Sequence, residues 1–174
     1  MWTTGDFEPH TYVIDSTMLP PSMIAALSEV DISEGAYSVS YLPPGIVMTH
    51  GLPPGSVIGF LPSKDSEMTS IHISTAFRLR IHEIAAADRP PGLVAEAKRQ
   101  ENGAVAMIDQ RNEDPMGEVP SADIIGFYWV SEGRITKYEP NSHYEFISSA
   151  GLFKLTPSIR AELRSRVLEV PAGQ

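Results

Sequence analysis

Four nitrogen-bearing side chains recur at even positions within residues 70–84: His72, Arg78, Arg80 and His82. The odd positions between and beside them are mostly apolar: Ile71, Ile73, Thr75, Phe77, Leu79 and Ile81. Alternation with a period of two is typical of a strand with one wet face, so we expect residues 70–84 to be a long strand. Two arginines on one such face can hold a carboxylate or a phosphate. The four side chains are therefore the candidate ligand-binding site, with an anion as the ligand.

Two alternatives stay open for this segment. The arginines can pair with acidic residues across the sheet instead of binding a ligand. Residues 77–87 can also form a helix, although the unbroken alternation favours the strand. If the segment is helical, the four side chains do not share one face.

A second candidate lies in the polar segment 109–123. It carries five acids against a single base, Arg111; the acids are Asp109, Glu113, Asp114, Glu118 and Asp123. The order of residues fails the EF-hand pattern, because Asp114 stands at the sixth position, where that pattern requires glycine. We interpret the segment as a flexible acidic loop that binds a basic protein partner or is simply solvated.

Motifs for metal, nucleotide or nucleophile chemistry are missing from the sequence. The five histidines are scattered, and His82-Glu83 lacks the second histidine of a zinc-protease motif. The chain has no cysteine, which excludes disulfides and thiolate metal sites. We expect no metal and no cofactor, and the sequence favours a non-enzymatic protein.

Charge and hydropathy narrow the classes of partner. The formal net charge is −9, from 22 acids and 13 bases, which disfavours nucleic acid and favours a basic protein. No apolar run reaches the ~20 residues of a membrane helix, and the first residues do not resemble a secretory signal. The expectation is a soluble, cytoplasmic protein without a membrane partner.

The remaining pattern predicts many short elements. Strands are expected at 12–14, within 36–61 around two Leu-Pro-Pro-Gly turns, at 104–108, in a hairpin over 124–139 and at 144–147. Helices are expected at 21–30, at 93–100 and from Pro157 onward, with a frayed tail at 171–174. The 174 residues then form one α+β domain, with a mainly antiparallel twisted sheet of about six or seven strands and about three helices.

Two functions follow from these features. The first is a non-enzymatic protein-interaction module, of the inhibitor, immunity or accessory type, that docks a more basic partner. The alternative is a protein that binds a small anionic molecule, or a hydrolase, with a pocket over the Arg78 and Arg80 face. A homodimer through an exposed sheet edge is compatible with both.

Overall fold

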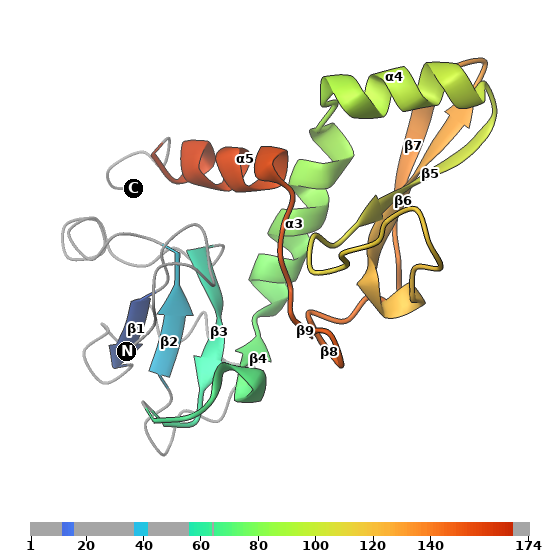
Figure 1. The fold of residues 1–174 in the computed structure, drawn as a ribbon. Coiled ribbons are helices and arrows are strands. Elements are labelled where there is room, and N and C mark those ends of the chain that lie inside the picture. The colour runs from blue at the N-terminus through green and yellow to red at the C-terminus, as the bar shows by residue number, and fades with distance from the viewer. Residues whose placement is uncertain (1–11, 16–36, 42–55, 64, 169–174) are drawn as a thin grey trace. The chain divides into compact units, whose positions relative to one another are not determined.

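The computed structural model describes residues 12–15, 37–41, 56–63 and 65–168. Its internal contacts group the chain into two compact units (Figure 1). The first unit comprises residues 1–81 and 162–174, and the second comprises residues 82–161. Each unit is described by itself below.

The first unit contains a four-stranded antiparallel sheet in the order β1-β2-β3-β4. Its strands are β1 (Tyr12–Asp15), β2 (Tyr37–Ser40), β3 (Val57–Leu61) and β4 (His72–Ile73), with a short 3-10 turn, η5 (Met68–Ser70), before β4. Every residue of β3 is buried, as expected of a strand covered on both faces. The expected strands near residues 12, 37 and 57 are confirmed.

The segment after β4 is a helix, so the prediction of a strand over residues 70–84 is wrong. Helix α3 spans Thr75–Ala87, and only two residues before it are extended. Its buried residues are Phe77, Ile81, Ile84 and Ala85, a spacing that fits one face of a helix. Leu79, which the alternating pattern places inside, is 59% exposed.

Local capping explains why the helix begins where it does. The Ser74 side-chain oxygen accepts a hydrogen bond from the backbone N–H of Phe77, at 3.4 Å. That contact satisfies one of the free N–H groups of the first turn. Ala85, Ala86 and Ala87 then supply strong helix formers at the far end. The apparent alternation covers only the first half of the helix and arises from a mixture of buried and exposed apolar residues.

The second unit contains a three-stranded antiparallel sheet in the order β5-β6-β7. The strands are β5 (Gly103–Ile108), β6 (Ile124–Ser131) and β7 (Arg134–Pro140), and helix α4 (Pro91–Gln100) precedes them. Glu132 and Gly133, with φ of 52° and 71°, form the two-residue turn between β6 and β7. Positive φ at both positions suits the type I′ turn of a tight hairpin. The predicted helix 93–100, strand 104–108 and hairpin 124–139 are confirmed.

The rest of the second unit is a polar connection followed by short elements. A 3-10 turn, η6 (Ser121–Asp123), leads into β6, and β8 (Ile147–Ser148) pairs with β9 (Gly151–Leu152). Helix α5 (Pro157–Leu168) follows, with Ile159 and Leu163 buried; its residues from Glu162 onward belong to the first unit. Extended structure in the predicted strand 144–147 is limited to Ile147.

The α+β class is confirmed, because helices accompany antiparallel sheets. The strands of the described ranges lie in separate sheets of four, three and two strands. A single twisted sheet of six or seven strands is therefore not confirmed. The predicted helix 21–30, both Leu-Pro-Pro-Gly turns and the tail 171–174 lie outside the described residues. Among the described helices, none is long and apolar enough to cross a membrane.

The assignment of α3 predicts opposite outcomes for two neighbouring apolar residues. Phe77→Ala removes a fully buried ring and should lower the free energy of unfolding by about 3–5 kcal/mol. Leu79→Ser alters an exposed side chain and should cost about 1 kcal/mol or less. Denaturant unfolding of both variants measures the difference. Equal losses would indicate that both side chains point inward, as in the alternating strand.

Candidate functional site

The four residues of the predicted anion site do not share a sheet face. His72 lies in β4, whereas Arg78, Arg80 and His82 lie in α3. Residues two apart on a helix point to different sides, so the expected alignment of Arg78 with Arg80 is wrong. His82 is half-buried, and its Nδ1 lies 2.8 Å from the Tyr138 hydroxyl. A ligand at these residues stays a prediction, without the common face that motivated it.

The five acids of segment 109–123 divide into two groups. Glu113, Asp114 and Glu118 are exposed. Asp109 and Asp123 are buried, at 0% and 3% exposure, so these two carboxylates point into the protein. Only the first group is accessible to a partner. Partner binding by this segment stays a prediction.

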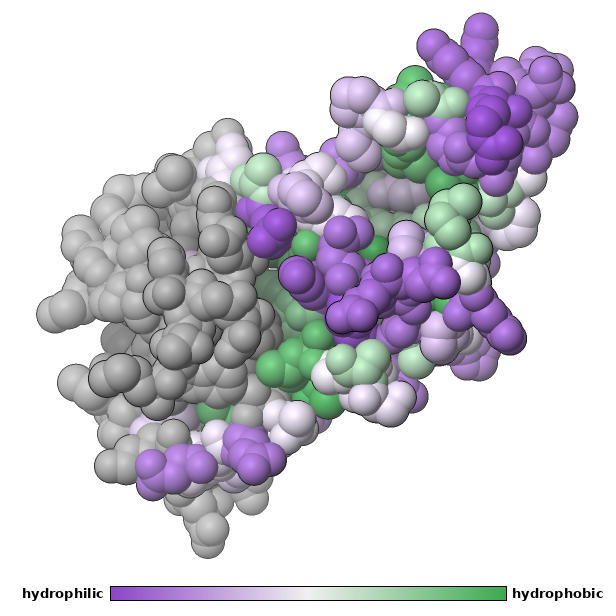
Figure 2. All heavy atoms as spheres, in the orientation of Figure 1, coloured by the Kyte–Doolittle hydropathy of each residue, from purple (hydrophilic) through white to green (hydrophobic). Residues whose placement is uncertain are grey.

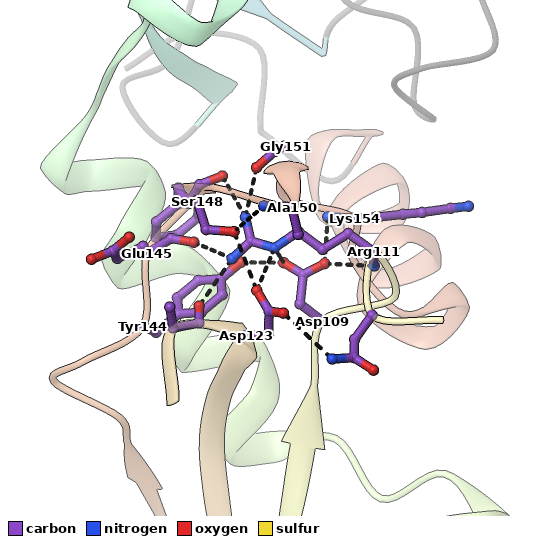
Figure 3. A network of polar contacts seen from close by, with 12 residues as sticks. Asp109, Arg111, Asp123, Tyr144, Glu145, Ser148, Ala150, Gly151 and Lys154 are labelled. Atoms are coloured by element: carbon purple, nitrogen blue, oxygen red, sulfur yellow. Dashed lines mark hydrogen bonds and ion pairs between the residues drawn. The ribbon is translucent and has the colours of Figure 1, made fainter. Parts of the chain in front are cut away.

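The residue that sequence analysis passed over is Arg111, whose side chain is only 4% exposed (Figure 3). Its Nε donates to the Asp123 carboxylate at 2.8 Å. Its two terminal nitrogens donate to four backbone carbonyls, those of Phe146, Gly151, Ala122 and Glu145. An arginine side chain has five N–H donors, so every donor of Arg111 is used.

Asp109 completes this network from the other side. Its Oδ1 accepts the backbone N–H of Arg111 at 2.9 Å and that of Lys154 at 2.8 Å. Its Oδ2 accepts the Tyr144 hydroxyl at 2.7 Å, and it lies 3.8 Å from the Arg111 Nε. Burial raises the pKa of the Asp109 carboxyl above its usual range, and these hydrogen bonds oppose the rise.

We call Asp109, Arg111, Asp123 and Tyr144 the arginine network. Because all five Arg111 donors are bonded within the protein, the network has no donor left for an external anion. Its role is to fix backbone carbonyls and turns from distant parts of the chain in one place. Arg111 was read in the sequence as the lone base of an acidic loop. The sequence feature that indicates a buried ion pair is the presence of Asp109 and Asp123 on either side of this single base.

A groove of about 340 Å³ lies beside the network in the second unit. It is lined by the start of α4, the edge of β5, part of segment 109–123 and the start of α5; its lining residues include Asp88, Glu96, Ala106, Gln110, Tyr128 and Ser158. Figure 2 shows a hollow below α4 in which apolar surface lies between hydrophilic rims. The volume is within the ~300–1,000 Å³ of typical ligand sites.

The network holds two walls of this groove. The groove residue Gln110 precedes Arg111, and its backbone N–H donates to the Lys154 carbonyl at 2.8 Å. Lys154 is in turn bonded to Asp109 and leads directly into Thr156 and Ser158 at the start of α5. Tyr128 of β6 also lines the groove, and its hydroxyl donates to the Ala85 carbonyl at 2.9 Å.

The formal charges in the groove lining are negative. Asp88 and Glu96 are its ionisable acids, and no lysine, arginine or histidine is among the described residues that line it. Glu96 pairs with Arg99. Asp88 accepts the Ser158 hydroxyl at 2.6 Å and, within the described chain, forms no ion pair. Asp88 therefore brings an uncompensated carboxylate to an otherwise largely apolar groove.

One arginine lies near this carboxylate without pairing with it. Arg89 donates to the backbone carbonyl of Asp88 at 2.6 Å, and its guanidinium lies 5.6 Å from the centre of the Tyr128 ring. The Tyr128 ring, which lines the groove, therefore already makes a cation–π contact with Arg89. The described part of the chain holds no group of three or more acids or histidines that could bind a metal ion.

Comparisons with protein-family models, with curated proteins and with solved structures found no match.

The arginine network predicts a large stability effect at one residue. Arg111→Met removes the charge that balances the buried Asp123 carboxylate and deletes five hydrogen bonds, and should lower the free energy of unfolding by about 3–5 kcal/mol. Arg99→Met is the matched control, because Arg99 is 71% exposed, and should leave the stability nearly unchanged. Chemical denaturation compares the two. Similar losses would contradict a structural role for the Arg111 donors.

Alkaline pH should destabilise the fold through a groove residue. Burial raises the pKa of Tyr128 to about 12, so the folded state holds this proton more tightly than the unfolded chain. Stability is then complete below about pH 10 and declines as the pH rises toward 12. At about pH 11 the contribution of Tyr128 to this loss is about 1 kcal/mol. Denaturation at several pH values should show a shallower decline for Tyr128→Phe, and an unchanged decline would refute this origin.

Proposed function

We propose that the chain is a non-enzymatic protein-interaction module that docks a basic partner in the groove beside β5. The observation that carries this proposal is the Asp88 carboxylate, which stands in a largely apolar groove with no basic side chain among its described lining residues. A lysine or arginine of a partner would supply the missing positive charge. Its aliphatic stem would cover apolar surface such as Leu93 and Met107.

The charge of the whole chain supports the same type of partner. A net charge of −9 attracts a basic protein over long range and accelerates its encounter. The exposed Glu113, Asp114 and Glu118 follow Gln110 and Arg111, next to the groove wall, and extend the acidic character of the segment. We propose that these three acids assist the approach, whereas Asp88 makes the fixed contact.

A second candidate function is the binding of a small neutral or cationic molecule in the same groove. It is favoured by the groove volume and by the hydrogen bond that orients Asp88 from Ser158. An anionic ligand, as expected at Arg78 and Arg80, gains no support from this groove, because the charged side chains among its described lining residues are both acidic. Thermal-shift measurements with small amines and with basic peptides separate the two candidates.

The proposal predicts binding of defined basic peptides. The probe is a heptapeptide with a central lysine between threonine and valine residues, and its control has glutamine in place of lysine. Asp88→Asn keeps the shape and the acceptor for Ser158 but removes the charge, and should weaken lysine-peptide binding about tenfold. Higher salt should weaken binding to the unaltered protein.

The matched protein control is Asp65→Asn, the same chemical change at an exposed residue of the first unit. It should leave the affinity of the lysine peptide unchanged. Fluorescence polarisation gives the affinities of both variants. Equal affinity for the lysine and glutamine peptides, or an equal loss in Asp88→Asn and Asp65→Asn, would refute docking at Asp88.

A further inference from the structure

One hydrogen bond at the start of β6 shows toward which neighbouring strand each of its residues directs its backbone N–H and C=O groups. The Asn141 N–H donates to the Ile125 carbonyl at 3.1 Å, so this carbonyl points toward β7, at the place where the pairing of β6 with β5 skips Ile125. Successive residues of a strand direct these groups to opposite sides. Gly126 and Tyr128 therefore direct theirs toward β5.

The same alternation fixes β5, which stands at the edge of its sheet. Val105 pairs with Tyr128, and the residue two further along pairs with Gly126, so these positions of β5 bond to β6. The residues between them direct their N–H and C=O groups away from the sheet. These outward residues are Ala104, Ala106 and Ile108.

Two contacts beyond β5 confirm this alternation. The Asp109 N–H donates to the Asp123 carbonyl at 2.8 Å, toward β6, so Ile108 and Gln110 point outward. The Gln110 N–H indeed donates outward, to the Lys154 carbonyl. Within the described residues, the outer edge is thus hydrogen-bonded to the chain itself at Gln110, whereas the outward groups of Ile108 have no hydrogen-bond partner. Ala104, Ala106 and Ile108 are half-buried, and no hydrogen bond from their outward groups is found within the described ranges.

We propose that the partner segment docked in the groove is an extended peptide that adds to the free edge of β5 as a further strand. This inference rests on the proposed function and specifies its mode. The outward groups of Ala104, Ala106 and Ile108 offer three donors and three acceptors to it. A strand rises about 3.4 Å per residue, so a segment of about five residues covers them.

Charge determines which segment fits. Residues Val105–Ile108 and Asp88 line the same groove, so a peptide along β5 passes the Asp88 carboxylate. A lysine or arginine on the side facing Asp88 completes an ion pair there. Main-chain bonds provide affinity in this mode of recognition, and alternate side chains provide specificity. The occupant is therefore an extended segment with one basic residue at a fixed position.

A second copy of this chain is the competing occupant, because sheet edges also pair with themselves. Each copy has a net charge of −9, and pairing two β5 edges would bring two acidic grooves together. Like charges in close contact oppose such a dimer. A basic peptide meets no such repulsion.

The peptide-side experiment uses the lysine heptapeptide with N-methyl groups on alternate amides, in two complementary sets. An added strand points every second amide toward β5, so one set should lose binding by about tenfold or more and the other should bind nearly as well as the parent. Fluorescence polarisation with unaltered protein gives both affinities. This design involves no protein variant that could fail to fold.

The protein-side experiment removes one outward donor. Ala106→Pro deletes an N–H that makes no bond to β6, a position where an edge strand accepts proline. It should weaken the parent peptide severalfold, whereas Ala106→Val, which keeps the N–H, should weaken it less. Thermal unfolding shows whether each variant is folded, and sedimentation records the oligomeric state.

Each result has a distinct meaning. Sensitivity to only one methylated set supports strand addition. Binding that is equally strong, or equally lost, with both sets overturns strand addition, and leaves docking intact wherever Asp88→Asn still weakens the parent peptide. No binding of any lysine peptide overturns the proposed function and this inference with it. A dimer that dissociates in Ala106→Pro assigns the edge to a second copy and overturns the inference.

Discussion

The buried guanidinium of Arg111 is the constraint on which the second unit depends. A cation removed from water is tolerated only when its charge is balanced and its donors are bonded. Arg111 meets both conditions through Asp123 and four backbone carbonyls, with Asp109 nearby. The carbonyls belong to residues that lie up to 40 positions from Arg111 in the chain. One side chain therefore fixes turns that have little regular secondary structure of their own.

The groove follows from this constraint. Its walls include Gln110 and the start of α5, and both are held by backbone bonds that meet at Asp109 and Lys154. The remaining side is the outer edge of β5 and of Gln110, which follows it. Within the described residues, this edge is hydrogen-bonded at Gln110 but not at Ala104, Ala106 or Ile108. Within the described part of the chain, the groove is largely apolar, its strand edge is unpaired and the Asp88 carboxylate has no ion-pair partner, which suits a basic, extended segment. The arginine network thus holds the groove walls, whereas different residues, Asp88 and the outward residues of β5, face the proposed partner.

Much of the second unit could be predicted from sequence, because its elements carry local signals. Turn residues mark the hairpin around Gly133, and Thr156 with Pro157 marks the start of α5. Residues 70–84 were mispredicted because five apolar residues and Thr75 coincide with a period of two, while Ser74 caps a helix that the pattern does not reveal. The groove was unpredictable, since it depends on contacts between distant segments. Length and composition predict one domain, and the contacts form two compact units.

The most direct test of the central claim is hydrogen exchange of the Arg111 side-chain Nε–H, followed by nuclear magnetic resonance. Arg99, whose side chain is 71% exposed, serves as the internal reference. A proton bonded to Asp123 in a side chain that is 4% exposed should exchange far more slowly than that of Arg99. Exchange of Arg111 as fast as that of Arg99 would show that the guanidinium is open to water, and would contradict the account.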